Sequence, residues 1–171
     1  MAKIAWGITG GGHLLKESLD AFGGLENADL FVSPAGMEVL DVYSLEPPVT
    51  PITDSTFSTK TSVAFASGVY DLFVIAPATS NSVAKFACGI SDTMITTLFA
   101  QCGKSRVPII VLPTDTEETV MSMGATKPLE IYPRPIDLEN AEKIKTFPSV
   151  SVVRTIEELL KKISETPGRG V

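Results

Sequence analysis

Cysteine and histidine are scarce in this chain. Its 171 residues include two cysteines, Cys88 and Cys102, and one histidine, His13. The two cysteines stand apart and form no CxxC motif, which argues against a zinc site or an iron–sulfur cluster built by this chain alone. We therefore expect no metal site, and the low cysteine content fits a reducing, cytoplasmic setting.

Charged residues and long hydrophobic runs are also lacking. Charged residues make up 20% of the sequence and the net charge is −6, which argues against a nucleic-acid partner. No run reaches the roughly 18 uncharged apolar residues that a membrane span requires. The apolar stretch before Gly7 is too short for a signal peptide. We expect no contact with a membrane.

Apolar residues, by contrast, are abundant, at 44% of the chain. The length suits one domain, which we expect to cover residues 1–165, followed by a frayed tail at 166–171. Because no membrane segment accounts for the apolar excess, we expect part of it to be buried between subunits of a homo-oligomer.

Strand-like and helix-like patterns alternate along the chain. This alternation predicts a mostly parallel sheet with helices on both faces. A long interruption at 44–61, rich in proline, serine and threonine, is expected to be a lid or a subunit arm. The strand-like runs are 3–8, 29–33, 72–76 and 107–112, the helical patterns are 12–22, 35–40, 82–88 and 92–102, and the alternation continues through 129–132, 138–145, 150–153 and 156–163.

The segment after the third apolar run carries the strongest functional signal. Residues 77–85 read Pro-Ala-Thr-Ser-Asn-Ser-Val-Ala-Lys, so a buried strand runs directly into hydroxyl and amide side chains and a helix. In a parallel sheet, ligands bind where strands end and the next helix presents unpaired N–H groups. The polar side chains at 79–82 can either cap that helix or contact a ligand.

Two further strand ends belong to the same edge of the predicted sheet. The turn at 7–13, Gly-Ile-Thr-Gly-Gly-Gly-His, is neither a Walker loop nor a GxGxxG fingerprint, because position 15 is leucine. It is equally compatible with ligand binding and with tight strand–helix packing. Ser33, before Pro34, is either a third polar contact or an ordinary helix cap.

These residues together carry a resemblance. The Gly-Ile-Thr-Gly-Gly turn, Ser33 and the 77–85 run resemble the homo-oligomeric flavin-containing flavoprotein family, which includes the flavin-dependent cysteine decarboxylases. The 77–85 run is similar to that family's P-A-S-x-N-T-x-x-K signature, and the likeness spans roughly residues 4–113. Residues 5–12, 112–115 and 132–142 further resemble archaeal-type flavoproteins and acceptor-type dihydromethanopterin reductases.

The resemblance implies a Rossmann-like (flavodoxin-like), three-layer, doubly wound α/β fold with FMN in the crevice. It implies the FMN phosphate near Gly10, Gly11 and Ser33, and Asn81 close to the isoalloxazine. Lys85 is expected either to form an ion pair with Asp92 or with a neighbouring subunit, which we favour, or to contact the cofactor directly. The full set of implied cofactor contacts is Thr9, Gly10, Gly11, Ser33, Ala78, Thr79, Ser80, Asn81, Ser82, Thr114 and Asp115.

The chain departs from the decarboxylases in its acid–base residues. The region where they carry a histidine, here 43–65, contains none, which makes oxidative decarboxylation doubtful. His13 is either a catalytic proton donor or a cap of the first helix. Arg134 and Asp137, in a strand-to-helix corner, either contact a pterin, an electron donor or a neighbouring subunit, or form a helix cap and ion pair.

The expected function is an FMN-dependent oxidoreductase, since a flavin without a dedicated acid–base partner suits hydride or electron transfer. The resemblance points to reduction of dihydromethanopterin to tetrahydromethanopterin. The alternatives are a ferredoxin-linked electron-transfer flavoprotein, a less favoured decarboxylase and a non-catalytic FMN-binding scaffold. The expected assembly is a homotrimer that can build a larger cage.

Overall fold

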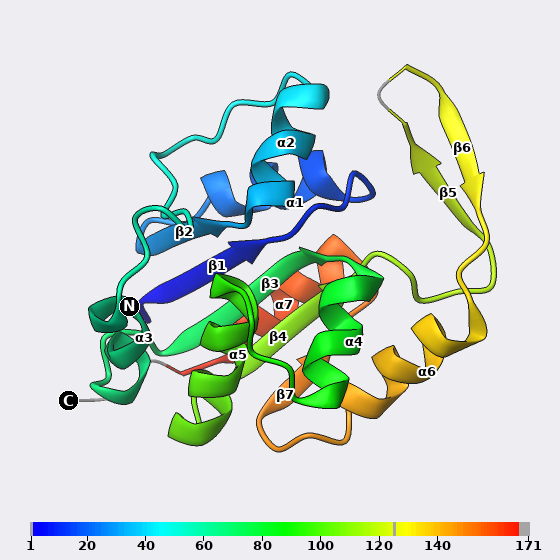
Figure 1. The fold of residues 1–171 in the computed structure, drawn as a ribbon. Helices are drawn as coiled ribbons and strands as arrows, with labels where there is room; N and C mark the ends of the chain where they lie inside the picture. The colour runs from blue at the N-terminus through cyan, green and yellow to red at the C-terminus, as the bar shows by residue number, and fades with distance from the viewer. Residues whose placement is uncertain (1, 125, 168–171) are drawn as a thin grey trace.

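The computed structural model describes residues 2–124 and 126–167 (Figure 1). Within them, a five-stranded parallel sheet has the order β2-β1-β3-β4-β7. This is a flavodoxin-like α/β fold, as expected, and the strand order reverses between β1 and β3. The sheet strands are β1 (Ile4–Ile8), β2 (Ala28–Val32), β3 (Leu72–Ala78), β4 (Ile109–Pro113) and β7 (Val150–Val152), and the helices are α1 (Leu15–Gly23), α2 (Pro34–Val42), α3 (Thr59–Ala66), α4 (Ser80–Cys88), α5 (Met94–Ser105), α6 (Pro135–Ile144) and α7 (Ile156–Glu165).

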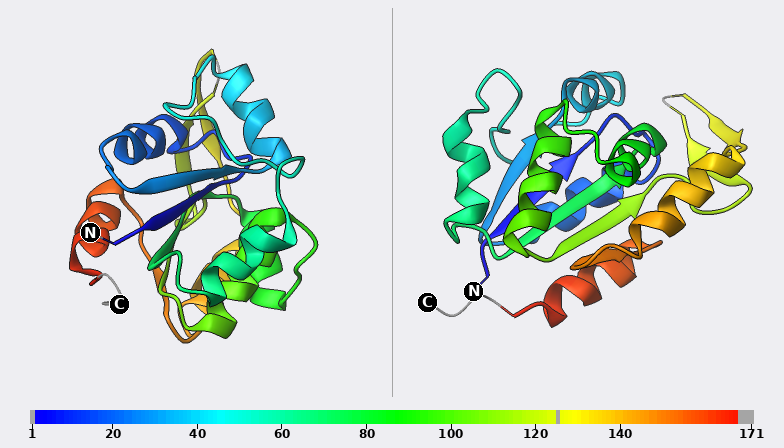
Figure 2. Two further views of the ribbon diagram at one scale, coloured as in Figure 1. Left: turned by 90° about the vertical axis from the view of Figure 1, so that its left-hand side faces the viewer. Right: turned by 60° about the horizontal axis from the view of Figure 1, so that its bottom comes forward.

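Helices cover both faces of the sheet, so its inner strands are buried along their whole length (Figure 2). Alternate side chains enter two separate cores. On one face Trp6 packs edge-on against Phe22 of α1, and its indole N–H donates to the carbonyl of Ala76 at 2.9 Å. On the other face Phe73 packs with residues of α3 and α5. The predicted layers are therefore confirmed.

The segment 129–132 does not continue the parallel alternation as the sequence suggested. It belongs to an antiparallel hairpin of β5 (Val120–Met123) and β6 (Pro128–Ile131), which stands apart from the main sheet (Figure 1). Parallel strands need a crossover of a dozen or more residues, whereas only residues 124–127 separate these two. All four residues of β6 are exposed, whereas the inner strands of the main sheet are buried under helices.

The long segment at 44–61 is largely irregular, as expected, but its middle is attached to the sheet. Ile52 forms a parallel bridge beside Phe31. Its N–H donates to Leu30 at 2.8 Å, and its carbonyl accepts from Val32 at 2.9 Å. Ile52 thus anchors the segment to the edge strand, and its role as a lid or arm stays a prediction. The single domain at 1–165 also stays a prediction, and residues 168–171 of the expected tail lie outside the described residues.

A polar cluster lies at the amino-terminal ends of β1, β2 and β3. The buried Tyr70 hydroxyl donates to Asp29 at 2.7 Å, and the Lys3 ammonium lies 3.0 Å from the same carboxylate oxygen. Burial alone would raise the pKa of Asp29, but the bonds from Tyr70 and Lys3 bring that pKa below its ordinary value. The ionised form of Asp29 is therefore stabilised by folding.

We expect Tyr70→Phe to lower the free energy of unfolding by about 1 kcal/mol at pH 7, because the partly exposed Asp29 carboxylate loses a hydrogen bond from a buried hydroxyl and solvent screens part of that loss. The folded-state pKa of Asp29 is depressed, so this contribution is present above about pH 4 and is lost as pH falls through that pKa. Urea unfolding of the wild-type protein and of Tyr70→Phe, from pH 7 to pH 3, measures the difference between their free energies of unfolding. This difference should become smaller as the pH falls. Tyr132→Phe is the control, since its hydroxyl binds Glu130 at the same 2.7 Å on the exposed hairpin and should matter little. Equal effects of the two substitutions would contradict the prediction.

Candidate functional site

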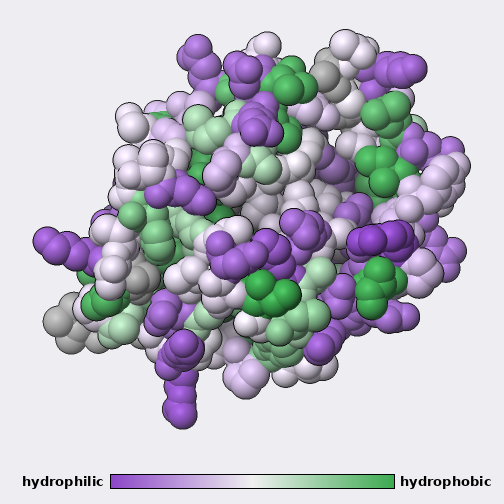
Figure 3. Space-filling view, in the orientation of Figure 1, coloured by the Kyte–Doolittle hydropathy of each residue, from purple (hydrophilic) through white to green (hydrophobic). Residues whose placement is uncertain are grey.

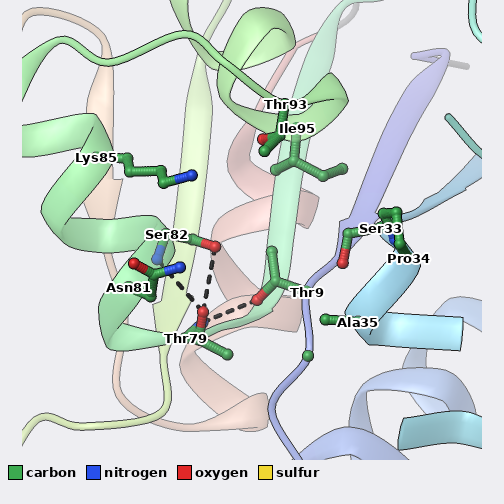
Figure 4. Close-up of a pocket in the computed structure, with 11 residues that line it drawn as sticks. Thr9, Ser33, Pro34, Ala35, Thr79, Asn81, Ser82, Lys85, Thr93 and Ile95 are labelled. Carbon is green, nitrogen blue, oxygen red and sulfur yellow. Dashed lines mark hydrogen bonds between the residues drawn. The ribbon is translucent and has the colours of Figure 1, made fainter. Parts of the chain in front are cut away.

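Three described helices begin at one cavity of about 430 Å³ beside the ends of β1, β2 and β3 (Figure 4). We call it the cap cavity, because Ser33, Thr79 and Thr93 line it and cap α2, α4 and α5. Each side-chain oxygen accepts the backbone N–H of the third residue of its helix, at 3.0 to 3.3 Å. The remaining lining residues are Thr9, Gly10, Pro34, Ala35, Asn81, Ser82, Lys85 and Ile95.

The converging helices give the cap cavity a positive potential. Each helix N-terminus carries about half a positive charge, from N–H groups that have no partner within the helix. Lys85 of α4 also lines the cavity, but Asp92 offsets its charge, because the Lys85 ammonium lies 2.9 Å from both carboxylate oxygens of Asp92. This ion pair confirms one of the two expected roles of Lys85. Hydroxyl donors and helix ends together suit a phosphate group.

Thr9 fastens the two strand ends that form the floor of the cavity. Its buried hydroxyl donates to the carbonyl of Pro77 at 3.0 Å and accepts from the N–H of Thr79 at 2.8 Å. The Ala76–Pro77 peptide beside it is cis. Because the Thr9 hydroxyl already donates its proton to Pro77, the role that the structure shows for Thr9 is to position Thr79. Its expected contact with a cofactor stays a prediction.

The glycine turn is explained by close packing at two positions. A Cβ on Gly10 would lie 2.7 Å from the Cβ of Ala35, at the start of α2. One on Gly11 would lie 2.7 Å from the Cγ2 of Thr114, at the end of β4. Neither distance is tolerable between carbon atoms, so a side chain would push the turn away from both neighbours. Tight packing thus suffices to explain these glycines, and it brings the turn to the rim of the cavity.

A second cavity of about 380 Å³ lies on the other side of Thr79 and Asn81, beneath the hairpin. We call it the hairpin cavity; it is also lined by Gly11, Gly12, His13, Tyr43, Ser80, Thr114, Asp115, Ser122, Gly124, Leu129 and Ile131. Figure 3 shows this face of the molecule hollowed beside the hairpin, over which apolar side chains gather.

The hairpin cavity has a negative potential, in contrast to the positive potential of the cap cavity. The Asp115 carboxylate accepts hydrogen bonds from Ser80 and from Thr114, the latter at 3.0 Å. Ser80 therefore does not belong to the same group of donors as Thr79 and Ser82, although the sequence placed them together. A dianionic phosphate would be repelled by Asp115, so the cap cavity is the better anion site.

The other expected site residues have distinct positions. Ala78 is fully buried and lines neither cavity; its carbonyl accepts from the N–H of Thr114 at 2.9 Å. Arg134 and Asp137 form a capping box and an ion pair of 2.7 Å at the start of α6, which confirms the structural alternative for this pair. The buried Asp137 carboxylate has a pKa held below its usual value by its bonds to Arg134.

His13 lies at the edge of the hairpin cavity and does not cap α1. The helix begins at Leu15, Leu14 occupies the cap position with a φ of 61°, and no side chain caps it, so that alternative is wrong. Burial lowers the pKa of His13, although Glu17 and Asp115 raise it. The imidazole is therefore neutral near pH 7.

Tyr43, Thr93 and Ile95 were missed from the sequence. Thr93 had a recognisable signal, because a threonine before a helical pattern with Thr96 three residues on is typical of a helix start. Tyr43 and Ile95 had none, since an aromatic residue at a helix end and an aliphatic one inside a helix are ordinary features. Only the packing of α2 and α5 brings them to the site.

A flavodoxin-like sheet with an anion site at its switch point defines a nucleotide- or flavin-binding α/β protein. The family described as Flavoprotein matches residues 1–169, and the chain belongs to this family.

Several relatives are similar over much of the chain. An uncharacterized protein of Methanocaldococcus jannaschii is 34% identical over 95% of each chain. A dihydromethanopterin reductase (acceptor) of Methanosarcina mazei is 37% identical over 70% of this chain and 58% of its own length. The crystal structure of Burkholderia xenovorans DmrB in complex with FMN, described as a cubic protein cage for redox transfer, is 41% identical, with a TM-score of 0.82 over 96% of this chain and 94% of that one.

Residues 2–124 and 126–167 contain no group of three or more His, Cys, Asp or Glu side chains arranged to hold a metal ion. No helix in that part of the chain has the length and apolar character needed to cross a membrane.

We expect Thr9→Val to lower the free energy of unfolding by about 1–2 kcal/mol, because the N–H of Thr79 loses its acceptor in a buried place. The carbonyl of Pro77 keeps the N–H of Thr9 at 3.2 Å. Urea unfolding is the measurement. Thr146→Val is the control: its hydroxyl donates to a carbonyl at 2.8 Å at an exposed helix end, so its loss should be small. An unchanged midpoint in Thr9→Val would contradict the role given to Thr9.

Proposed function

We propose that this chain reduces a dihydropterin, specifically dihydromethanopterin, and that it holds FMN across the cap and hairpin cavities. It is an FMN-dependent oxidoreductase, and FMN is its cofactor; both statements rest on its family and on its similarity to DmrB and the dihydromethanopterin reductases. The observation that carries the proposal is the convergence of three capped helix starts and Lys85 on one cavity.

The residues present suit FMN. The helix starts at Ser33, Thr79 and Thr93 would hold the phosphate, with Ser82 and Lys85 beside it. Asn81 lines both cavities, and its exposed amide has no hydrogen-bond partner within the described residues, so it would meet the cofactor between phosphate and ring. The apolar side chains of Leu129 and Ile131 would border the ring on the hairpin side. When bound, FMN supplies the hydride that the protein itself lacks.

The chain's own part in the reaction is to bind, orient and shield. Thr9, Gly10 and Gly11 hold the turn against α2 and β4, which fixes the width of the crevice. His13 lines the hairpin cavity, but its lowered pKa leaves it neutral near pH 7. The proton that joins the reduced substrate therefore comes from solvent, or through His13 as a relay that donates one imidazole proton and regains it.

We propose that the active unit is a homotrimer and that such trimers can assemble into a larger cage. Both cavities open to the surface, and apolar side chains are exposed near them at Met37, Ile90 and Met121, at 37%, 47% and 61%. A second copy of the chain would cover such surfaces. The description of DmrB as a cubic cage supports the same proposal.

We expect Ser82→Asp to lose most of its bound FMN, because an added carboxylate would face the phosphate in the cap cavity. The fold should survive, since an acidic residue in the first turn favours a helix such as α4. Flavin absorbance per protein after purification, and FMN titration of the stripped protein, are the measurements. Ser55→Asp, on the exposed segment before α3, is the charge-matched control. Normal flavin content in Ser82→Asp would remove this residue from the site.

Photoreduced protein mixed anaerobically with dihydromethanopterin should reoxidise within seconds, with one tetrahydromethanopterin formed per flavin. Stopped-flow absorbance at the oxidised flavin band follows the reaction. A protein that ignores the pterin but is reduced rapidly by ferredoxin would instead be an electron carrier. That result would contradict the proposal that dihydromethanopterin is the substrate.

A further inference from the structure

A third cavity of about 350 Å³ adjoins the hairpin cavity. We call it the Glu17 cavity. It lies between the first turn of α1, the end of α2 and β5, with walls formed by Leu14, Tyr43, Leu45 and Met121. It shares Gly12, His13 and Tyr43 with the hairpin cavity, so one flat ligand can extend from one space into the other.

The Tyr43 ring lies against the glycine turn, where it lines both spaces. A Cβ on Gly12 would lie 2.3 Å from the Tyr43 hydroxyl oxygen and 2.7 Å from the carbon that bears it. The absence of a side chain at Gly12 thus lets the ring lie against the turn. An aromatic face beside Met121 and Leu45 is suited to stacking a flat heteroaromatic ring.

Besides Lys16 and His13, the cavity is lined by Glu17, an exposed residue that brings a carboxylate to it. Within the described residues no hydrogen bond or ion pair engages this carboxylate, because the neighbouring Lys16 ammonium binds Asp20 at 2.6 Å. The other carboxylate near the crevice, Asp115, already accepts from Ser80 and Thr114. Glu17 is therefore the carboxylate ready to accept new hydrogen bonds.

We propose that the Glu17 cavity binds the 2-amino-4-oxopyrimidine ring of the pterin substrate, with Glu17 accepting two hydrogen bonds from its amidine edge. A carboxylate matches two parallel N–H donors, which a pterin offers at its 2-amino group and the adjacent ring nitrogen. Tyr43 stacks on that ring, and the second ring of the pterin extends past His13 toward the hairpin cavity. This inference rests on the proposed function and adds the residue that selects the substrate class.

The test compares two oxidised ligands that differ at one edge. 6-Methylpterin carries the 2-amino group, and 6-methyllumazine has a carbonyl there that faces the carboxylate with lone pairs. We expect calorimetry on the FMN-loaded protein to give at least tenfold tighter binding of the pterin. In Glu17→Gln that preference should fall to within twofold, with flavin content unchanged.

Two variants separate this role from a general effect. Glu26→Gln removes an exposed carboxylate that does not line the cavity, and this variant should keep the full preference. Tyr43→Leu should weaken both ligands by a similar factor and leave their ratio intact, because stacking does not read the 2-amino group. A preference that survives Glu17→Gln, or is missing from the wild-type protein, overturns the inference.

The proposed function is judged separately, by whether the reduced protein transfers electrons to dihydromethanopterin. Turnover without a Glu17-dependent preference would leave the reductase standing and remove this subsite. The preference without turnover would leave a pterin-binding flavoprotein with another reaction.

Discussion

One buried hydroxyl joins the parts on which the site depends. Thr9 ties the end of β1 to the end of β3, at the point where the strand order reverses. From this junction the chain leaves in two directions, into the glycine turn before α1 and into α4. Because the sheet is parallel, the helices that follow β2 and β3 also begin at this edge. The position of each helix start therefore follows from how the strand ends are held together.

The same edge is divided into regions of opposite charge. Three helix starts make the cap cavity positive, whereas Asp115, which accepts hydrogen bonds from Ser80 and Thr114, makes the hairpin cavity negative. Thr79 and Asn81 stand on the boundary and line both. A cofactor with a phosphate at one end and a neutral ring at the other matches this division. The free carboxylate of Glu17 extends the negative side into a third space, where a ligand with paired N–H donors fits.

The fold could be predicted because its signals are local. Apolar runs at 72–76 and 107–112 are buried on both sides, so they appear as uninterrupted hydrophobic stretches, and capping residues such as Ser33 and Thr79 precede the helices directly. The sequence did not predict the hairpin, because its strands are short and β6 is exposed. An exposed strand lacks the hydrophobic pattern that burial gives to a sequence. His13 was read as a possible cap because it precedes a helix, but the backbone gives that position to Leu14.

The sequence by itself determined the class of fold, the edge of the sheet that carries the site, and most of the polar groups found there. Those properties follow from side-chain type and spacing along a few consecutive residues. Only the tertiary structure decided how those groups are shared between cavities, separating Ser80 from Ser82, which lie two residues apart on one helix. It alone brought Tyr43 against Gly12 and Glu17 beside the crevice. Such contacts join residues from different elements, and the packing distances that create them have no counterpart in the linear order of the chain.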